Sequence, residues 1–109
     1  MNDTYKFKVK RKGKKTPVEV RFSESYFGLD ETEDLQGATV CVLEFPNKEI
    51  YSGVALLHPN EIADRWIGIR HSFGRAVDDF VANTAPHRYY WRQAKTALWS
   101  AFIRAYNGH

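Results

Sequence analysis

Residues 4–23, TYKFKVKRKGKKTPVEVRFS, decide the first half of the fold because apolar and charged residues alternate in them with a period of two. The alternation is interrupted once, by a short basic segment that contains Gly13 and Pro17. A period of two is typical of a β-strand with one buried face, while glycine and proline are typical of turns. The stretch therefore predicts a β-hairpin with one apolar and one charged face.

This hairpin is also the most basic part of the chain. Seven of the ten residues from Lys6 to Lys15 are lysine or arginine. A basic hairpin can follow a phosphate backbone, and each contact then adds to the salt dependence of binding. The alternative is a solvated hairpin whose charges protect an edge strand. The residues predicted here to bind a polyanion are Lys8, Lys10, Arg11, Lys12, Lys14 and Lys15.

The next segments complete the predicted sheet. Residues 24–34 contain five acidic residues and no basic one, and we expect 24–37 to form a solvated loop. Residues 38–45 and 49–57 are apolar segments on either side of Pro46, which predicts a second hairpin. The two hairpins are expected to form one four-stranded, largely antiparallel sheet.

The second half of the chain changes to a helical period. In residues 60–82 the apolar positions follow one another at spacings of three and four, and Asn60 is a candidate N-cap. Residues 83–86 interrupt this pattern, and a second helix is expected to end near Asn107, before Gly108.

The chain is therefore predicted to be a single α+β domain, residues 1–109. Two hairpins in 4–57 are followed by two C-terminal helices in 60–107, both packed on one face of the sheet.

Two glycines lie inside the first predicted helix. Gly68 and Gly74 each cost about 1 kcal/mol of helix stability relative to alanine, which suggests a packing or contact reason for them. Gly68 falls on the predicted polar face beside Arg65 and Ser72. We expect a phosphate or another chain to approach the backbone there, and Arg65 is one of the predicted binding residues.

The second predicted helix carries a basic and aromatic stripe. Arg88, Arg92, Lys95 and Trp99 share one narrow face, and residues 82–109 contain no acid. Cations next to a large aromatic ring suit an anionic partner that can also be stacked upon. The alternative is that Trp99 packs on the sheet while the basic side chains reach into solvent.

The junction of the two halves carries a resemblance. Residues 53–60 follow the pattern Gly-x-Ala-x-x-His-Pro-Asn, and the helix after them contains the pair Gly74-Arg75. Residues 53–76 thus resemble a pattern in small proteins encoded by tailed bacteriophages and prophages. The chain departs from it with Glu61 after the capping residue and with Ile69, where the pattern has arginine. The resemblance implies a phage-like origin and no particular activity.

Nothing in the sequence indicates catalysis or a bound metal. The four histidines are scattered, and Cys41 lies between two valines in a predicted strand. Ser72 is not in a nucleophile elbow, and the chain has no glycine-rich phosphate loop. We therefore expect a protein that is not an enzyme and has no cofactor.

The predicted function is that of a small phage-type accessory protein that binds a polyanion, with nucleic acid as the first choice. The alternative is a modulator that docks on a host or phage protein, because the acidic segment 24–34 would repel a phosphate backbone. The opposite charges of that segment and the basic hairpin would also let copies of the chain form a homo-oligomer. With no signal-peptide pattern and no bilayer-spanning run, we expect no membrane association and a cytoplasmic location, the host cytoplasm if phage-encoded.

Overall fold

A computed structural model of the chain describes residues 3–29, 34–58, 64–84 and 88–108. Within these ranges it describes all side chains except those of residues 26–29, 34–36 and 88–90.

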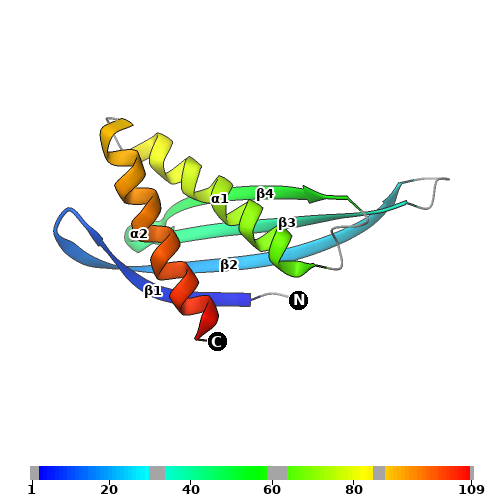
Figure 1. Ribbon diagram of the computed structural model, residues 1–109, viewed down its shortest axis with the longest axis horizontal. Coiled ribbons are helices and arrows are strands. Elements are labelled where there is room, and N and C mark those ends of the chain that lie inside the picture. Colours follow the sequence, from blue (N-terminus) through cyan, green and yellow to red (C-terminus); the bar gives the residue numbers. More distant parts are fainter. Residues whose placement is uncertain (1–2, 30–33, 59–63, 85–87, 109) are drawn as a thin grey trace.

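The first four elements form one antiparallel sheet, as predicted (Figure 1). The strands are β1 (Asp3–Arg11), β2 (Lys14–Leu29), β3 (Asp34–Phe45) and β4 (Glu49–Leu57). They pair in chain order, β1-β2-β3-β4, and the short 3-10 turn η2 (Pro46–Lys48) joins the last two. This order leaves β1 and β4 as the two edge strands.

Two helices cover one face of the sheet, which confirms the predicted α+β fold. Figure 1 shows α1 (Arg65–Thr84) across β4 and β3, while α2 (Arg88–Asn107) lies over β1. The first helix begins five residues later than predicted. Asp64 Oδ1 accepts a hydrogen bond from the backbone N–H of Trp66 at 3.0 Å, which caps its first turn. The predicted cap, Asn60, lies outside the described residues.

The β2–β3 hairpin is longer than predicted. Residues 24–29 and 34–37 were expected to form a loop, and that prediction is wrong because the strand ladder continues from Glu24↔Thr39 to Leu29↔Asp34. The cause is visible in the composition, since Tyr26 and Phe27 have high strand propensity. Pairing also satisfies the backbone N–H and C=O groups that a loop would leave to water.

The core lies between the sheet and the helices. Alternate strand residues point toward the helices, and the ring of Phe73 on α1 stacks on Phe102 of α2 at a centroid distance of 4.3 Å. Cys41 is fully buried in this core, and burial raises the pKa of its thiol. The largest fully buried side chains include Phe22, Leu43, Phe45, Ile69, Phe73, Leu98 and Phe102.

Helix α1 approaches the sheet closely through glycine. A Cβ atom at Gly68 would lie 2.3 Å from Thr39 Oγ1, so this glycine faces β3. Ser72 is also fully buried, and its hydroxyl donates to the Ile69 carbonyl at 3.3 Å. The prediction that Gly68 and Ser72 belong to a polar face open to a phosphate is therefore wrong. The chain that approaches Gly68 is the protein's own strand.

Side chains of α1 cover the free edge of β4. Asp79 Oδ2 accepts a hydrogen bond from the backbone N–H of Ser52 at 3.2 Å. Two residues further along, the Arg75 guanidinium donates to the Val54 carbonyl. Both are edge groups of the kind that an additional strand would use. The Ser52 N–H and the Val54 C=O are therefore occupied by side chains of α1.

Candidate nucleic-acid interface

The basic residues of the N-terminal hairpin lie at one end of the sheet. Lys12 and Gly13 form its turn with positive φ angles of 52° and 78°, a conformation that suits glycine. Pro17 was expected in the turn but lies within β2, opposite Lys8. A proline is tolerated there because β2 pairs with β3 only from Glu19 onward. The tip of the hairpin therefore projects past the other two strands.

The register of this hairpin places like charges opposite each other. Lys10 pairs with Lys15 and Arg11 pairs with Lys14 across the two strands. Like charges directly opposite in an antiparallel pair destabilise it, by up to about 1 kcal/mol. An anion bound between Lys10 and Lys15 would remove this repulsion.

The described carboxylates form their ion pairs with residues other than the hairpin lysines, although the charge of nearby Lys12 helps to lower the pKa of Glu49. Every carboxylate whose side chain the structure describes takes part in an ion pair or a hydrogen bond within the fold. Within the described part of the chain, no ion pair involves the five hairpin lysines, Lys8, Lys10, Lys12, Lys14 and Lys15. The engaged acids are Asp3 and Glu24 with Arg65, Glu19 and Glu44 with Arg21, Glu49 with Arg11, Asp78 with Lys95, Asp64 with the Trp66 N–H, and Asp79 with the Ser52 N–H.

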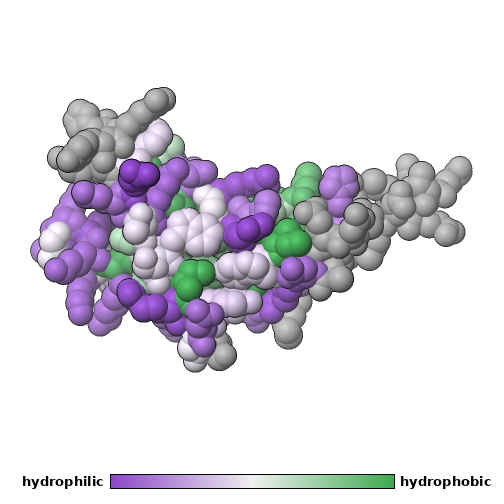
Figure 2. Space-filling view, viewed as in Figure 1, coloured by the Kyte–Doolittle hydropathy of each residue, from purple (hydrophilic) through white to green (hydrophobic). Residues whose placement is uncertain are grey.

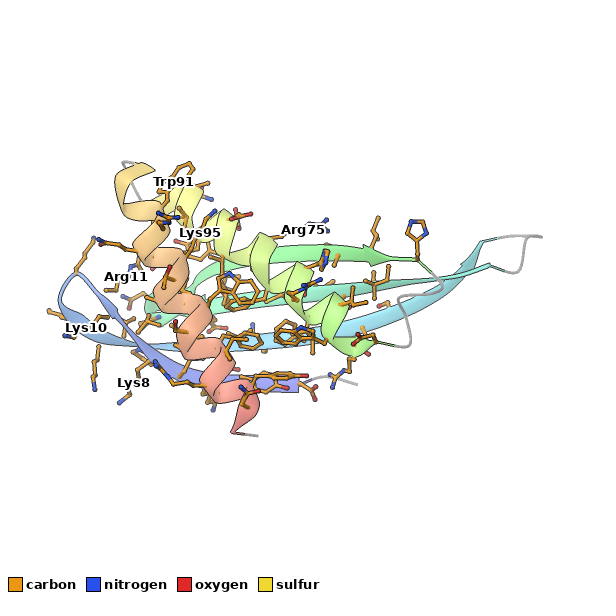
Figure 3. All side chains as sticks on the ribbon, in the orientation of Figure 1. Lys8, Lys10, Arg11, Arg75, Trp91 and Lys95 are labelled. Atoms are coloured by element: carbon orange, nitrogen blue, oxygen red, sulfur yellow. The ribbon has the colours of Figure 1, made fainter. Side chains whose placement is uncertain are left out.

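A groove separates the basic strand β1 from helix α2. One hollow of about 310 Å³ is lined by Lys8, Val9, Lys10 and Lys15 of the hairpin and by Ala97, Ser100, Ala101 and Arg104 of α2. A second hollow of about 340 Å³ shares Val9, Lys10 and Ala97 with it and continues to Arg11, Lys12 and Gln93. The lining residues, all within the described part of the chain, include no acid. Figure 2 shows hydrophilic residues gathered at this end of the molecule, and Figure 3 shows Lys8 and Lys10 pointing away from the sheet.

The sequence did not single out the α2 side of this groove. Ala97, Ser100, Ala101 and Arg104 follow one another at helical spacings of three, one and three, so they share a face. That face lies next to the buried positions Leu98 and Phe102, and its small residues leave room beside the strand. The signal in the sequence that could have indicated this side of the groove was the spacing of small residues around Arg104.

Two predicted binding residues are ion-paired within the fold instead. Arg11 forms a two-pronged pair with Glu49 at 2.7 and 2.8 Å, and its guanidinium lies over the rings of Phe45 and Phe80 at 5.0 and 5.3 Å. Arg65 contacts Asp3 and pairs with Glu24 at 2.6 Å. Hydrogen bonds to these carboxylates raise the pKa of Arg65. Both arginines join distant parts of the fold.

The predicted stripe on α2 is divided by its contacts with α1. Lys95 pairs with Asp78 of α1 at 2.8 Å, an acid that the sequence of α2 alone does not contain. Trp99 is half-buried and packs edge-on against Phe73 at 4.6 Å. Arg92 is exposed, while the side chain of Arg88 lies outside the described residues. Lys95 and Trp99 therefore belong to the helix–helix contact, whereas the alternative expected Trp99 to pack on the sheet and the basic side chains to reach into solvent.

The Arg11–Glu49 pair makes stability depend on pH. The hydrogen bond from Arg11 lowers the pKa of Glu49 below its usual value of about 4.3, while burial raises the pKa of its neighbour Tyr51 to about 12. A lowered carboxylate pKa stabilises the fold above about pH 4, and this contribution disappears as the pH falls through the folded-state pKa.

We therefore expect Glu49→Gln to lower the free energy of unfolding at pH 7 by about 1–2 kcal/mol, with a smaller difference at pH 3. Urea denaturation at both pH values measures this. An equal difference between the two proteins at pH 7 and pH 3 would contradict the assignment.

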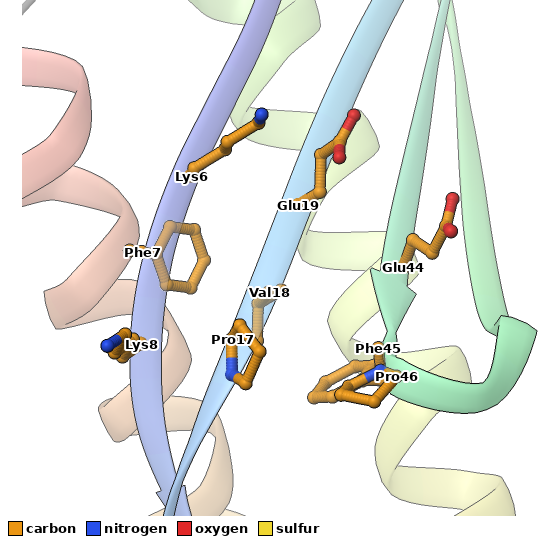
Figure 4. Close-up of a pocket in the computed structure, with 9 residues that line it drawn as sticks. All are labelled: Lys6, Phe7, Lys8, Pro17, Val18, Glu19, Glu44, Phe45 and Pro46. Atoms are coloured by element: carbon orange, nitrogen blue, oxygen red, sulfur yellow. The ribbon is translucent and has the colours of Figure 1, made fainter.

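The face of the sheet opposite the helices carries a different surface. Ile50, Val54 and Leu56 on β4 are 52, 46 and 69 % exposed, and Val40 and Val42 on β3 lie beside them. At the hairpin end this face has a hollow of about 610 Å³, where β2 separates from β3 (Figure 4). The hollow has Phe7, Pro17, Val18, Phe45 and Pro46 in its walls and both signs of charge around them, from Lys6, Lys8, Glu19 and Glu44.

Comparisons with known proteins add no family to these observations. No protein-family model matches the chain, and neither a curated protein nor a solved structure matches it. Within the described residues, no group of three or more histidine, cysteine or acidic side chains is placed to hold a metal ion. In the same part of the chain, neither helix is both long and apolar enough to cross a membrane.

Proposed function

We propose that this protein binds nucleic acid through the basic β1–β2 hairpin and the neighbouring surface of α2. The observation that supports the proposal is the distribution of charge, because the described carboxylates pair with other groups and, among the described residues, five hairpin lysines form no ion pair. Two of these, Lys10 and Lys15, stand directly opposite each other. Such a surface favours a polyanion over a neutral or cationic partner. The phage-type origin implied by the sequence resemblance stays a prediction.

The test is the salt dependence of binding to a labelled 20-nucleotide DNA, measured by fluorescence anisotropy from 50 to 300 mM salt. If about five phosphates are neutralised, the slope of log K against log salt should be about −3.5 for a single strand and −4.5 for a duplex. A slope near zero, or no binding at 50 mM salt, would contradict the proposal.

A second candidate function, docking on another protein, is favoured by the apolar strip of the open sheet face. Exposed apolar patches on proteins commonly mark interaction sites. This strip, Ile50, Val54 and Leu56, lies on the same face as Lys6 and Lys8 of β1. We propose for it a folded partner whose apolar surface is bordered by acidic residues.

The double substitution Val54→Asp and Leu56→Asp separates this candidate from the first. Both side chains are exposed, so the fold should tolerate the changes. The docking surface is supported if the double substitution abolishes a complex with a protein partner that survives nuclease treatment and reduces DNA affinity no more than twofold. An unchanged complex would contradict it.

A further inference from the structure

We infer, on the basis of the nucleic-acid binding proposed above, that the groove between β1 and α2 binds the phosphodiester backbone of one strand and leaves the bases uncontacted. The groove is the place where basic residues of the hairpin and of the helix border one concave surface. Lys8, Lys10 and Lys15 come from the hairpin, and Arg104 comes from α2.

The spacing of these cations suits a repeating anion. Lys8 and Lys10 are two residues apart on one strand, so their Cα atoms are separated by about 6.7 Å. That separation is close to the distance between successive phosphates along one nucleic-acid strand. Arg104 and Ser100 on α2 provide hydrogen-bond donors on the opposite side of the hollow.

The floor of the groove explains why a backbone fits and a base does not. In the hollow that holds Arg104, the remaining walls are Val9, Ala97 and Ala101, and no lining residue there is aromatic. Binding of single strands through their bases relies on aromatic rings as stacking platforms. The neighbouring rings are engaged inside the fold, where Trp99 packs on Phe73, and Tyr106 lies 5.0 Å from Trp66.

Two exposed positions allow the groove to be tested without disturbing the core. Ala97 and Ser100 both line it and are both exposed, so substitutions there should leave the fold intact. We expect Ala97→Glu to weaken DNA binding at least tenfold, because it places a carboxylate among the lysines. Ser100→Trp should also weaken binding at least fivefold, because it fills the hollow without changing the charge.

The matched control is Thr96→Glu, which introduces the same charge one residue away at an exposed position that lines neither hollow. We expect it to weaken binding no more than twofold. If Thr96→Glu and Ala97→Glu reduce DNA affinity equally and Ser100→Trp has no effect, the losses reflect only the added negative charge, and the groove assignment is overturned. Circular dichroism of each variant verifies that it is folded.

The ligand chemistry is tested with three DNAs of 20 nucleotides: a mixed-sequence single strand, its duplex and an abasic single strand. Because the groove contacts phosphates, the abasic strand should bind within threefold of the mixed-sequence strand, while comparison with the duplex identifies the preferred source of the backbone. A loss of more than tenfold for the abasic strand would overturn backbone recognition. If the wild-type protein binds none of the three, the nucleic-acid function itself fails, an outcome distinct from failure of the groove.

Discussion

Replacing Gly53 with alanine is expected to lower the free energy of unfolding by about 3 kcal/mol or more. A Cβ atom at this position would lie 2.3 Å from the Ser72 carbonyl oxygen and 2.4 Å from the Ala76 backbone nitrogen. Both atoms belong to the backbone of α1, so no side-chain rotation can relieve the overlap. The helix would have to move away from the sheet and loosen the packing of Ile69 and Phe73. Thermal and urea denaturation measure the effect.

Gly74 provides the control for this prediction because it is also a glycine next to packed structure. A Cβ atom there would meet only Trp99 Cζ2, at the ordinary contact distance of 3.5 Å. Gly74→Ala should therefore raise stability by up to about 1 kcal/mol, through helix propensity alone. Gly68→Ala should lower stability because Thr39 Oγ1 is too close. If Gly53→Ala and Gly74→Ala shift the melting temperature in the same direction, close packing does not explain Gly53.

The second large effect is expected on binding. The double charge reversal Lys10→Glu and Lys15→Glu should reduce DNA affinity at least 100-fold at low salt, equivalent to about 2.7 kcal/mol. It removes two cations from the groove and adds two anions to it. Because the two residues face each other across the hairpin, the cross-strand pair still carries like charges. Stability should therefore change by less than about 0.5 kcal/mol, and loss of binding cannot be attributed to unfolding.

The control for this change is Arg70→Glu with Ser25→Glu and Leu56→Glu, which alters the net charge by the same amount at exposed residues away from the tip of the hairpin. A loss of less than tenfold is expected for it. The single change Lys15→Glu adds an independent criterion, since it places opposite charges across the hairpin. It should raise stability by a few tenths of a kcal/mol while it weakens binding. Equal losses of affinity in the hairpin variant and in this control would contradict a role specific to the hairpin.

The sequence predicted the strands and helices because their periodicity reflects burial directly. Tyr5 and Val9 alternate with lysines, and the structure buries the two apolar residues and exposes the lysines. The polar face of α1 was harder to predict, since glycine and serine carry little hydrophobic signal. Gly68 and Ser72 are buried because β4 has Gly53 beneath the helix, which lets the two backbones come together. That relation joins residues far apart in the chain and is absent from any local pattern.

The candidate site shows the same limit. The hairpin lysines are recognisable in the sequence because they are consecutive and lack local acids. The partners of Arg65 and Lys95 come from other elements, Glu24 from β2 and Asp78 from α1, so the sequence of each helix alone suggested free cations. The groove itself exists only because α2 lies beside β1, and Arg104 acquires its neighbours from that packing.

The two occupied groups on the edge of β4 restrict how a peptide can extend this sheet. Peptides that recognise a sheet by extending it use its backbone groups, which are the same for every amino acid. Here Asp79 and Arg75 occupy those groups at Ser52 and Val54. At these two positions, recognition by another chain would therefore depend on side chains. Each side chain is encoded separately, so a single mutation can alter specificity there while the sheet stays the same.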